Sequence, residues 1–560
     1  MLSSDKILIQ WLVNRAAEAG VGYVVLSPGS RNAPFAIAFD AHPQIQTLVI
    51  HDERCAAFIA LGLAQETKKP VALCCTSGSA CLNYYPAIAE SYYRNIPLLV
   101  LTADRPADWI NQGDGQTIVQ HEVFKNHTRA FLELDQNSFE LNSHLEQQLQ
   151  ASLNQLHALW KGPVHINIGL NEPLYQTAPL QDFNSYLPTI EKSDMNLPDF
   201  SVLEGQKIMV LVGQMAPDPQ FENSLALFAQ NSNVCVLVEN TSNLHNPQFN
   251  PCIDRSLNGF DLQNPAYHPD ILISFGGAIV SKRIKAFLRQ HKAKVHWRVA
   301  PDFPEMNTFR LALQYFDIPA AQFMAALSRQ SGSLNQINYN GKWKAIDYHA
   351  KDRQQLFHTD ANTLTDYDVF AAFFELLQGP AVLHLANSSV VRYAQLFDPV
   401  EGVRYESNRG TSGIDGSVST AVGAALASPE LPHFLLCGDI SLIYDSNAFW
   451  TQAFPKNLKI VVIQNKGGGI FQIIPGPAES SLRSQYFEAV HNTSPAAVVR
   501  GFGFEVLECS EKQKLHKDLM QFMEDHSEVQ LLQIQTDSAA NAPTLDHFFQ
   551  FIKQNHDNIS

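Results

Sequence analysis

Short runs of apolar residues alternate along the chain with longer stretches in which apolar residues recur every three or four positions. In the first third the runs cover residues 23–26, 71–75 and 97–102, and each ends in a polar or glycine-containing turn: SPGSR, TSGSA and ADRP. Continuous apolar runs of this length are typical of buried strands, and the intervening periodicity is typical of helices. The alternation predicts βαβ units around a parallel sheet.

The same pattern recurs in the rest of the chain. We expect strands at residues 207–212, 234–239 and 271–275 in a middle section, and at 381–385, 434–437 and 460–464 in the last third. A stretch rich in Pro, Asn and Asp at about 171–200 favours a linker, and a second polar stretch covers about 328–340. We predict an α/β fold of three doubly wound parallel-sheet domains, at residues 1–180, 200–335 and 355–560.

The first and last thirds resemble one another. YVVLSPGSRNAPFAI and AVLHLANSSVVRYAQL both pass from a strand through a polar turn into a helix that carries an arginine. HDERCAAFIALGLAQ and GIDGSVSTAVGAALAS both place an acidic turn before a helix of small residues, which permits close packing. The similarity indicates two related domains that face each other, although two unrelated doubly wound domains would show much the same pattern.

Composition narrows the class of protein. The 560 residues include 39 Lys and Arg against 55 Asp and Glu, a net charge of −16 that disfavours non-specific binding to nucleic acid or an anionic membrane. The eight cysteines form no CxxC pair and lie in apolar runs, which indicates reduced, buried thiols. The N-terminus has no signal-peptide pattern, and no apolar run reaches the roughly 18 residues that span a bilayer. We expect a soluble cytoplasmic protein without nucleic-acid partners or stable membrane insertion.

The most specific motif lies in the last third. Gly438-Asp439-Ile440-Ser441 follows one apolar run, and Asn465, twenty-six positions after Asp439, follows the next and precedes the glycine turn KGGG. Parallel strands end at one sheet edge, where α/β folds bind ligands. A carboxylate, an amide oxygen and a turn carbonyl suit Mg²⁺, which keeps positions open for diphosphate oxygens. The alternative is a pair of ordinary strand-end turns.

This motif resembles the thiamine-diphosphate fingerprint, in which GDG is followed after about two dozen residues by NN. The chain departs from it at Ile440, in place of the second glycine, and at Gln464, in place of the first asparagine. The resemblance implies that Asp439, Asn465 and the Gly467 carbonyl hold Mg²⁺ (or Mn²⁺). It further implies an N-terminal pyrimidine-binding domain, a central domain and a C-terminal diphosphate-binding domain, with these additional residues at the cofactor: Ser388, Gly438, Ile440, Ser441 and Phe471.

A thiamine-diphosphate enzyme also needs a carboxyl group at N1′ of the aminopyrimidine, so that the cofactor can deprotonate its own C2. Glu53 opens an apolar helix after His51 and Asp52, where burial raises its proton affinity. The alternative is a plain acidic residue at a helix start. The resemblance implies that the cofactor bridges two subunits of a homodimer or homotetramer. It also makes Ile414 the bulky residue that bends the cofactor, although a loop anchor would explain Ile414 equally well.

Four strings, SPGSR, LTADRP, NSSVVR and SNRGTSGIDG, resemble one branch of this superfamily. That branch is the 2-succinyl-5-enolpyruvyl-6-hydroxy-3-cyclohexene-1-carboxylate synthase (MenD) family, and the resemblance runs from about residue 5 to 550. It implies decarboxylation of 2-oxoglutarate and 1,4-addition of the resulting carbanion to isochorismate, in menaquinone biosynthesis.

Both of these substrates are dicarboxylates, and arginine offers each carboxylate a bidentate partner. The family match implies a substrate pocket lined by Ser30, Arg31, Arg105, Gln116, Lys282, Arg283, Ser388, Arg392 and Arg409, with Phe471 and Ile474 as its apolar wall. The alternative for each arginine is a solvated surface charge. Gly115 replaces the family's asparagine before Gln116, which puts one contact to the substrate or intermediate in doubt.

Two other functions remain open. A decarboxylase or acetolactate-type synthase acting on pyruvate would keep the cofactor but would not need so many arginines. A catalytically inactive homologue would have no physical reason to keep Glu53, Asp439 and Asn465. The Gly276-Gly277-Ala278 turn lacks a full GxGxxG pattern, so we interpret it as structural.

Overall fold

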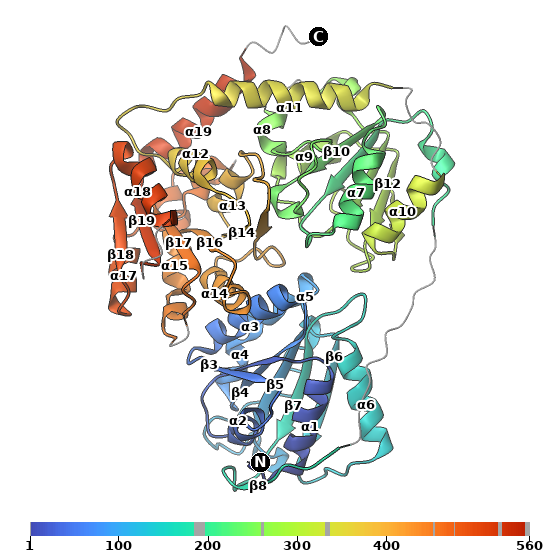
Figure 1. Ribbon diagram of the computed structural model, residues 1–560, viewed down its shortest axis with the longest axis vertical. Helices are drawn as coiled ribbons and strands as arrows, with labels where there is room; N and C mark the ends of the chain where they lie inside the picture. Colours follow the sequence, from blue (N-terminus) through green and yellow to red (C-terminus); the bar gives the residue numbers. More distant parts are fainter. Residues whose placement is uncertain are drawn as a thin grey trace. The chain divides into compact units, whose positions relative to one another are not determined.

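The computed structural model describes residues 2–183, 197–258, 262–330, 337–451, 454–474, 476–524 and 529–554. It divides into two compact units. The first unit contains residues 1–192, 408–433 and 442–458; the second contains 193–407, 434–441 and 459–560. Three parallel sheets, each with its own helices, organise the chain (Figure 1).

The first sheet has the strand order β3-β2-β4-β5-β7-β6. Its strands are β2 (Tyr23–Leu26), β3 (Gln46–Val49), β4 (Val71–Cys75), β5 (Leu98–Asp104), β6 (Ala130–Asp135) and β7 (Val164–Gly169). Apolar side chains of α1 (Ile7–Glu18), α2 (Ala33–Asp40) and α6 (Ser143–Asn154) pack on one face with Val24 and Leu26. The helix α3 (Glu53–Thr67) packs against β2 and β4.

The central sheet has the order β10-β9-β11-β12-β13 and is parallel throughout. Its strands are β9 (Ile208–Val212), β10 (Val234–Val238), β11 (Ile271–Phe275), β12 (Val295–Val299) and β13 (Leu313–Phe316). Successive residues of β9 alternate between two apolar clusters, one with α7 (Pro219–Phe228) and α10 (Ala320–Gln330) and the other with α9 (Lys282–Gln290). This alternation explains why the buried strand is apolar at every position.

The third sheet has the order β15-β14-β16-β17-β19-β18. Its strands are β14 (Ala381–Leu385), β15 (Val403–Glu406), β16 (His433–Gly438), β17 (Leu458–Gln464), β18 (Val506–Cys509) and β19 (Leu531–Gln535). Helices α12 (Asp366–Leu376), α13 (Ser389–Ala394), α18 (Lys512–Glu524) and α19 (Ser538–Lys553) contribute to one apolar core with these strands.

The predicted α/β class with parallel sheets is confirmed, and all nine predicted strands are present. The first predicted linker contains a short strand, β8 (Thr177–Pro179), which pairs with β1 (Leu2–Ser4) in antiparallel fashion. This part of the stretch therefore belongs to a two-stranded sheet and is not a linker. Residues 184–196 of that stretch and 331–336 of the second polar stretch lie outside the described residues.

The two small-residue helices singled out in the sequence, α3 and α14 (Ser417–Ala427), pack closely within the first unit. A Cβ on Gly62 would lie 2.1 Å from the carbonyl oxygen of Thr420, and one on Gly423 would lie 2.1 Å from that of Ile59. Backbone therefore meets backbone at both glycines, and any side chain there would force the helices apart.

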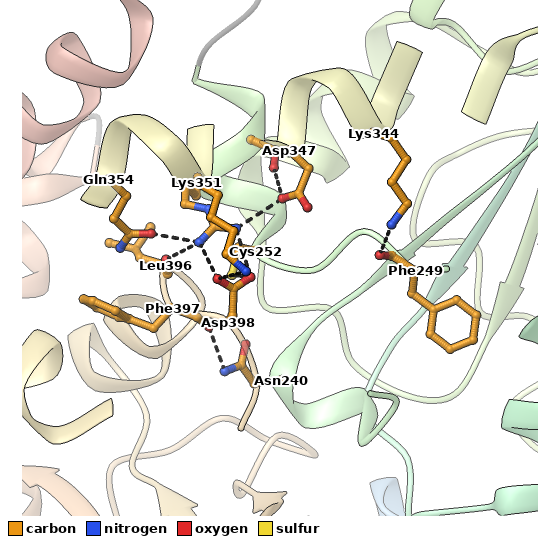
Figure 2. A network of polar contacts seen from close by, with 12 residues as sticks. Asn240, Phe249, Cys252, Lys344, Asp347, Lys351, Gln354, Leu396, Phe397 and Asp398 are labelled. Atoms are coloured by element: carbon orange, nitrogen blue, oxygen red, sulfur yellow. Dashed lines mark hydrogen bonds and ion pairs between the residues drawn. The ribbon is translucent and has the colours of Figure 1, made fainter. Parts of the chain in front are cut away.

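A buried charge network fixes the short helix α8 (Ile253–Leu257) within the second unit (Figure 2). Arg255 donates to Asp347 on α11 (Tyr339–Gln355) at 3.2 Å, and to Asp398, which follows α13, at 3.1 Å. Its side chain is 1 % exposed. Loss of Arg255 would leave the buried carboxylate of Asp347 without its ion-pair partner, which commonly costs about 3–5 kcal/mol, whereas the partly exposed Asp398 would keep Lys351 at 3.3 Å.

Candidate cofactor and substrate site

The two halves of the predicted metal motif meet at one edge of the third sheet. Asp439 is the first residue of α15 (Asp439–Tyr444) after β16, and Asn465 follows the neighbouring strand β17. The backbone N–H of Lys466 donates to Asp439 Oδ2 at 2.7 Å, and that of Ile440 donates to Oδ1 at 2.7 Å. The strand-end argument from the sequence therefore holds for this pair of turns.

Asp439 is almost completely buried, with 1 % of its surface exposed. Burial raises the pKa of its carboxyl, while backbone N–H donors and the charge of His491 act in the opposite direction. His491 Nε2 lies 3.6 Å from Asp439 Oδ2, and its backbone N–H donates to the carbonyl of Lys466 at 3.2 Å. This histidine was not among the residues predicted from the sequence.

Hydrogen bonds fix the turn after β17: the Gly468 N–H donates to the Glu488 carbonyl at 2.7 Å, and the Gly467 carbonyl accepts from the Gly469 N–H at 2.9 Å and keeps its second lone pair. Asn465 Nδ2 donates to Asp366 Oδ2 at 3.0 Å, which leaves the amide oxygen as the atom of Asn465 suited to a cation. A Cβ on Gly467 would lie 2.7 Å from the carbonyl oxygen of Glu488, so only glycine fits there. The carboxylate, amide and carbonyl oxygens of this edge form the hard donor set that Mg²⁺ prefers, and the residues fit the predicted ion.

The remaining predicted cofactor residues of the second unit lie in turns of the same sheet or close to them in sequence. Ser388 precedes α13 with a φ of 73°, and Ser441 is buried in α15. No atom lies within 4 Å of the position that a Cβ on Gly438 would take. Phe471 belongs to α16 (Ile470–Ile473), its ring centroid 6.0 Å from that of Phe487, and Ile474 follows directly.

Glu53 is the first residue of α3, as the sequence predicts. The carboxylate of Asp52 caps the helix by accepting from the N–H groups of Arg54 at 2.8 Å and Cys55 at 3.2 Å. Burial raises the pKa of Glu53, and the charge of Asp52 raises it further. A carboxyl group with raised proton affinity at a fixed helix start is what proton exchange with a ring nitrogen requires.

Residues 444–450, which follow the metal motif in sequence, hold this helix start within the first unit. Arg54 donates to the carbonyl of Tyr444 at 2.6 Å, and the rings of His51 and Trp450 stack with centroids 4.6 Å apart. Asp445 accepts from the backbone N–H of Ser419 at 2.7 Å, and burial raises its pKa to about 6. Tyr444, Asp445 and Trp450 were not among the residues predicted from the sequence.

Two of the predicted arginines lie at strand ends of the first sheet. Arg31 is buried and donates to the carbonyl of Leu170 at 2.9 Å, while Ser30 beside it is exposed. Arg105 pairs with Asp114 at 3.1 Å and donates to the carbonyl of Gly115 at 3.0 Å. The position that departs from the family pattern thus contributes its backbone to Arg105. Gln116 is exposed and has a positive φ of 54°.

The loop that carries Arg409 and Ile414 also belongs to the first unit. Its backbone is held by Glu90, a fully buried residue of α5 (Tyr85–Tyr93), which accepts from the N–H groups of Gly410 at 2.8 Å and Thr411 at 2.6 Å. Arg409 is 8 % exposed, and Ile414 is partly buried. A buried carboxylate thus shapes the turn that carries a predicted substrate-binding arginine.

Two of the predicted arginines of the second unit, Arg283 and Arg392, act electrostatically on Asp254 of α8. Ser281 caps α9 by accepting from Ile284 N–H at 3.1 Å and donates its hydroxyl to Asp254. Arg283 stacks over the ring of Phe549 at 4.8 Å, and Arg392 donates to the carbonyl of Ser388 at 2.5 Å. Burial raises the pKa of Asp254, which the charges of Arg283 and Arg392 oppose. Lys282 is exposed at the start of α9.

The structure therefore collects the predicted residues into two sets, one in each unit. The first unit holds Ser30, Arg31, Glu53, Arg105, Gln116, Arg409 and Ile414; the second holds Lys282, Arg283, Ser388, Arg392, Gly438, Asp439, Ile440, Ser441, Asn465, Gly467, Phe471 and Ile474. Within the described ranges there is no group of three or more His, Cys, Asp or Glu residues that could bind a metal. The predicted Mg²⁺ site would use one carboxylate, one amide oxygen and one backbone carbonyl, so it does not require such a group.

Gly276 and Gly277 form a structural turn, as the sequence indicated. A Cβ on Gly276 would lie 2.9 Å from the carbonyl oxygen of Gly213. The Gly277 N–H donates to the carbonyl oxygen of Gln214 at 2.8 Å. Six polar residues that contact the functional turns or helix starts were not predicted from the sequence: the buried Glu90, Glu239, Asp366 and Asp445, and the partly exposed Asp254 and His491. Glu239 accepts from the N–H groups of Val280 and Ser281, each at 2.7 Å, just before α9. For the five acidic residues the only sequence signal is an acidic side chain within or beside an apolar segment, and His491 carries no signal of this kind.

Family descriptions match the central sheet and parts of the first and third sheets. "Thiamine pyrophosphate enzyme, N-terminal TPP binding domain" matches residues 8–127, "Middle domain of thiamine pyrophosphate" matches 180–379, and "Thiamine pyrophosphate enzyme, C-terminal TPP binding domain" matches 388–534. The predicted relationship to thiamine-diphosphate enzymes is confirmed.

Curated relatives decide the branch. A 2-succinyl-5-enolpyruvyl-6-hydroxy-3-cyclohexene-1-carboxylate (SEPHCHC) synthase from Christiangramia forsetii is 41% identical over 95% of this chain and 96% of its own length. The corresponding synthases from Flavobacterium johnsoniae and Porphyromonas gingivalis are 37% identical over 97% and 34% identical over 98% of this chain, and 98% of each relative is covered. The chain belongs to the SEPHCHC synthase family.

Membership of the SEPHCHC synthase family confirms the predicted resemblance, and the similarity extends through the central sheet as well as the two cofactor-binding ones. It favours the main prediction over the acetolactate-type alternative. In the described parts of the chain, no helix combines the length and apolar content needed to cross a membrane.

Proposed function

We propose that this SEPHCHC synthase family member decarboxylates 2-oxoglutarate and adds the remaining four-carbon unit to isochorismate in a 1,4 sense, a step of menaquinone biosynthesis. The observation that carries the proposal is the 2.7 Å hydrogen bond from Lys466 N–H to Asp439 Oδ2, because it joins the two turns of a cofactor motif at one sheet edge. The named relatives, similar over nearly the whole chain, supply the substrate assignment.

The cofactors are thiamine diphosphate and Mg²⁺ (or Mn²⁺). Asp439 Oδ, Asn465 Oδ1 and the Gly467 carbonyl would hold the ion, and Gly438 and Ser441 would approach the diphosphate. When bound, thiamine diphosphate supplies the carbon nucleophile for the 2-oxo group and accepts the electron pair released with carbon dioxide. The protein contributes position, charge and exclusion of water.

Glu53 would hydrogen-bond N1′ of the aminopyrimidine and exchange a proton there. Two features support this role: the residue sits at a capped helix start, and burial raises the pKa of its carboxyl. A carboxyl group of ordinary acidity would be ionised and less able to share a proton with the ring nitrogen.

Carboxylate recognition would rest on the cations at strand-end turns and helix starts. A guanidinium group pairs with a carboxylate through two parallel hydrogen bonds, which orients the substrate as well as binding it. The proposed set is Ser30, Arg31, Arg105, Gln116, Lys282, Arg283, Arg392 and Arg409, with Ile414, Phe471 and Ile474 as apolar contacts.

We also propose that the chain acts as a homodimer or homotetramer, with the Glu53 set of one copy and the Asp439 set of another completing each site. Light scattering of the purified chain would measure the molar mass, and a monomer with full activity would contradict this arrangement. A reducing cytoplasmic location is supported by the cysteines, all eight of which are buried and form no disulfide.

The function is tested by turnover. The purified chain with thiamine diphosphate and Mg²⁺ should consume isochorismate only when 2-oxoglutarate is present, and the loss of isochorismate absorbance reports the rate. Pyruvate in place of 2-oxoglutarate is the matched donor control. Consumption of pyruvate without loss of isochorismate would instead identify an acetolactate-type enzyme.

A further inference from the structure

The buried carboxylate of Asp366 lies behind the metal motif and has no cationic partner among the residues described. It is the first residue of α12 and is 3 % exposed. Its Oδ1 accepts from Thr536 Oγ1 at 2.6 Å and from Asn541 Nδ2 at 2.9 Å, and its Oδ2 accepts from Asn465 Nδ2 at 3.0 Å. Burying a carboxylate among neutral donors is costly, so such a group is expected to have a specific role.

Helix capping does not explain this carboxylate. Thr365 and Asp368 already form a capping box at the start of α12, in which the Thr365 N–H donates to Asp368 Oδ2 at 2.8 Å. The side chain of Asp366 turns instead toward β17 and α19. The start of the helix would therefore be retained without it.

The contact with Asn465 determines which end of that amide is available to a cation. A carboxylate can only accept, so Asn465 must offer its NH₂ group to Asp366 and direct its oxygen elsewhere. Asp366 is itself fixed, because its own backbone N–H donates to Asn541 Oδ1 at 2.8 Å in a reciprocal pair. Thr536 N–H also donates to the carbonyl of Gln464, the residue before Asn465, at 3.1 Å.

We propose that Asp366 is a positioning residue for the divalent cation, acting through the orientation of the Asn465 amide oxygen. This inference rests on the proposed metal role of Asn465. Groups that orient metal ligands from behind typically contribute about 10–100-fold to metal affinity. Asp366→Ala removes the one acceptor that the described residues offer to the Asn465 amide nitrogen, and we expect a loss in that range. Asp366→Asn has one oxygen for three donors and should show a smaller loss in the same direction.

The test is Mn²⁺ titration of the full chain in the presence of thiamine diphosphate, followed by electron paramagnetic resonance of the free ion. Asp368→Ala is the matched control, since Asp368 lies two residues away on the same helix and contacts Thr365, Thr359 and Lys512 rather than Asn465. It should lower Tm but leave the Mn²⁺ Kd within about twofold. High Mg²⁺ should restore kcat to Asp366→Ala by mass action.

A double-mutant cycle separates the possible failures. If Asp366 acts through Asn465, Asp366→Ala should have no further effect on Kd in an Asn465→Ala chain. An unchanged Kd in Asn465→Ala alone would overturn the metal assignment itself. A normal effect of Asn465→Ala with an unchanged Kd in both Asp366 variants, or an equal loss in Asp368→Ala, would overturn only the role of Asp366. Should Asp366→Ala not fold, Asp366→Asn provides the same comparison.

Discussion

Asn447 donates from Nδ2 to Asp52 Oδ2 at 2.7 Å, within the first unit. Asp52 uses its other oxygen to cap the helix that begins with Glu53. Asn447, which lies eight residues after Asp439 in the sequence, therefore helps to hold Asp52, the residue that caps α3.

Loss of this cap should affect activity as well as stability. Asp52→Ala removes the acceptor for two helix N–H groups and for Asn447, a change that typically costs about 0.5–2 kcal/mol. Because Glu53 is the next residue, we expect a lower Tm and a lower kcat. Asp218→Ala is the matched control, since Asp218 caps α7 in the central sheet by accepting from Phe221 N–H at 3.0 Å. It should lower Tm alone; equal kcat losses in both variants would contradict the local role of Asp52.

Glu53→Gln should separate binding from chemistry. The amide keeps the size of the side chain but cannot exchange a proton with N1′. Removal of a positioned acid or base typically lowers the rate by about 10²–10⁴. Calorimetric titration with thiamine diphosphate and Mg²⁺ should give an affinity close to that of the unchanged chain. Wild-type turnover in this variant would show that Glu53 is only a helix-start charge.

Asp445 should make stability depend on pH in a defined direction. Burial raises its pKa from 3.8 to about 6, so between those values the folded chain holds a proton that the unfolded chain has lost. The favourable contribution of Asp445 is therefore largest below pH 3.8 and decreases as pH rises through about 6. Relative to Asp445→Asn, the unchanged chain should lose about 1.4 kcal/mol of unfolding free energy between pH 5 and pH 7.5.

Urea unfolding of both chains at a series of pH values, followed by fluorescence, measures this difference. The comparison with Asp445→Asn cancels the other titrating groups, which both chains share. A stability difference that is constant with pH would show that Asp445 has no raised pKa in the folded chain.

The accuracy of the strand predictions depended on what each strand buries. β4, β9, β11 and β14 are apolar at nearly every position because helices cover both sheet faces, and continuous apolar runs predicted them well. Five of the six edge strands of the parallel sheets, β3, β6, β13, β15 and β18, have mixed burial and gave no such run, whereas the edge strand β10 is buried throughout and was predicted. Three interior strands were missed: buried histidines interrupt β7 and β12, and glutamines interrupt β19.

The Nε2 atom of each of these histidines has a hydroxyl partner on the neighbouring strand. His165 lies 2.8 Å from the hydroxyl of Thr102, and His296 lies 2.9 Å from that of Ser274. Burial lowers the pKa of His165 to about 3 and that of His296 to about 4, so both are neutral near pH 7. A neutral, hydrogen-bonded histidine is compatible with a sheet core, but its partner is visible only in the fold.

The same distinction applies to the site. Asp439 and Asn465 could be predicted because each directly follows an apolar run, and strand ends converge in a parallel sheet. Asp366 and Glu90 could not be predicted, because each contacts a turn far away in sequence: Asp366 lies 99 residues from Asn465 and Glu90 lies 320 residues from Gly410. Local pattern identifies the turns, whereas the packing of distant elements determines which carboxylate holds each one.

The last prediction concerns the choice of donor substrate. Arg392 lies on α13, the helix that begins directly after Ser388. Its guanidinium donates to the Ser388 carbonyl at 2.5 Å. We expect Arg392 to pair with the distal carboxylate of 2-oxoglutarate. Truncating one member of a desolvated charge pair generally costs about 2–5 kcal/mol. Arg392→Ala should therefore lower kcat/KM for 2-oxoglutarate by roughly 30-fold or more.

The loss should be selective, because pyruvate has no distal carboxylate and gains nothing from Arg392. Steady-state kinetics with each donor at saturating isochorismate measure both values. Arg500→Ala is the matched control: Arg500 forms a solvent-exposed pair with Glu508 at 2.7 Å in the same unit, and its removal should change neither value. If Arg392→Ala weakened turnover of both donors equally, the arginine would be a structural charge of α13, because only a contact with the distal carboxylate can distinguish the two acids.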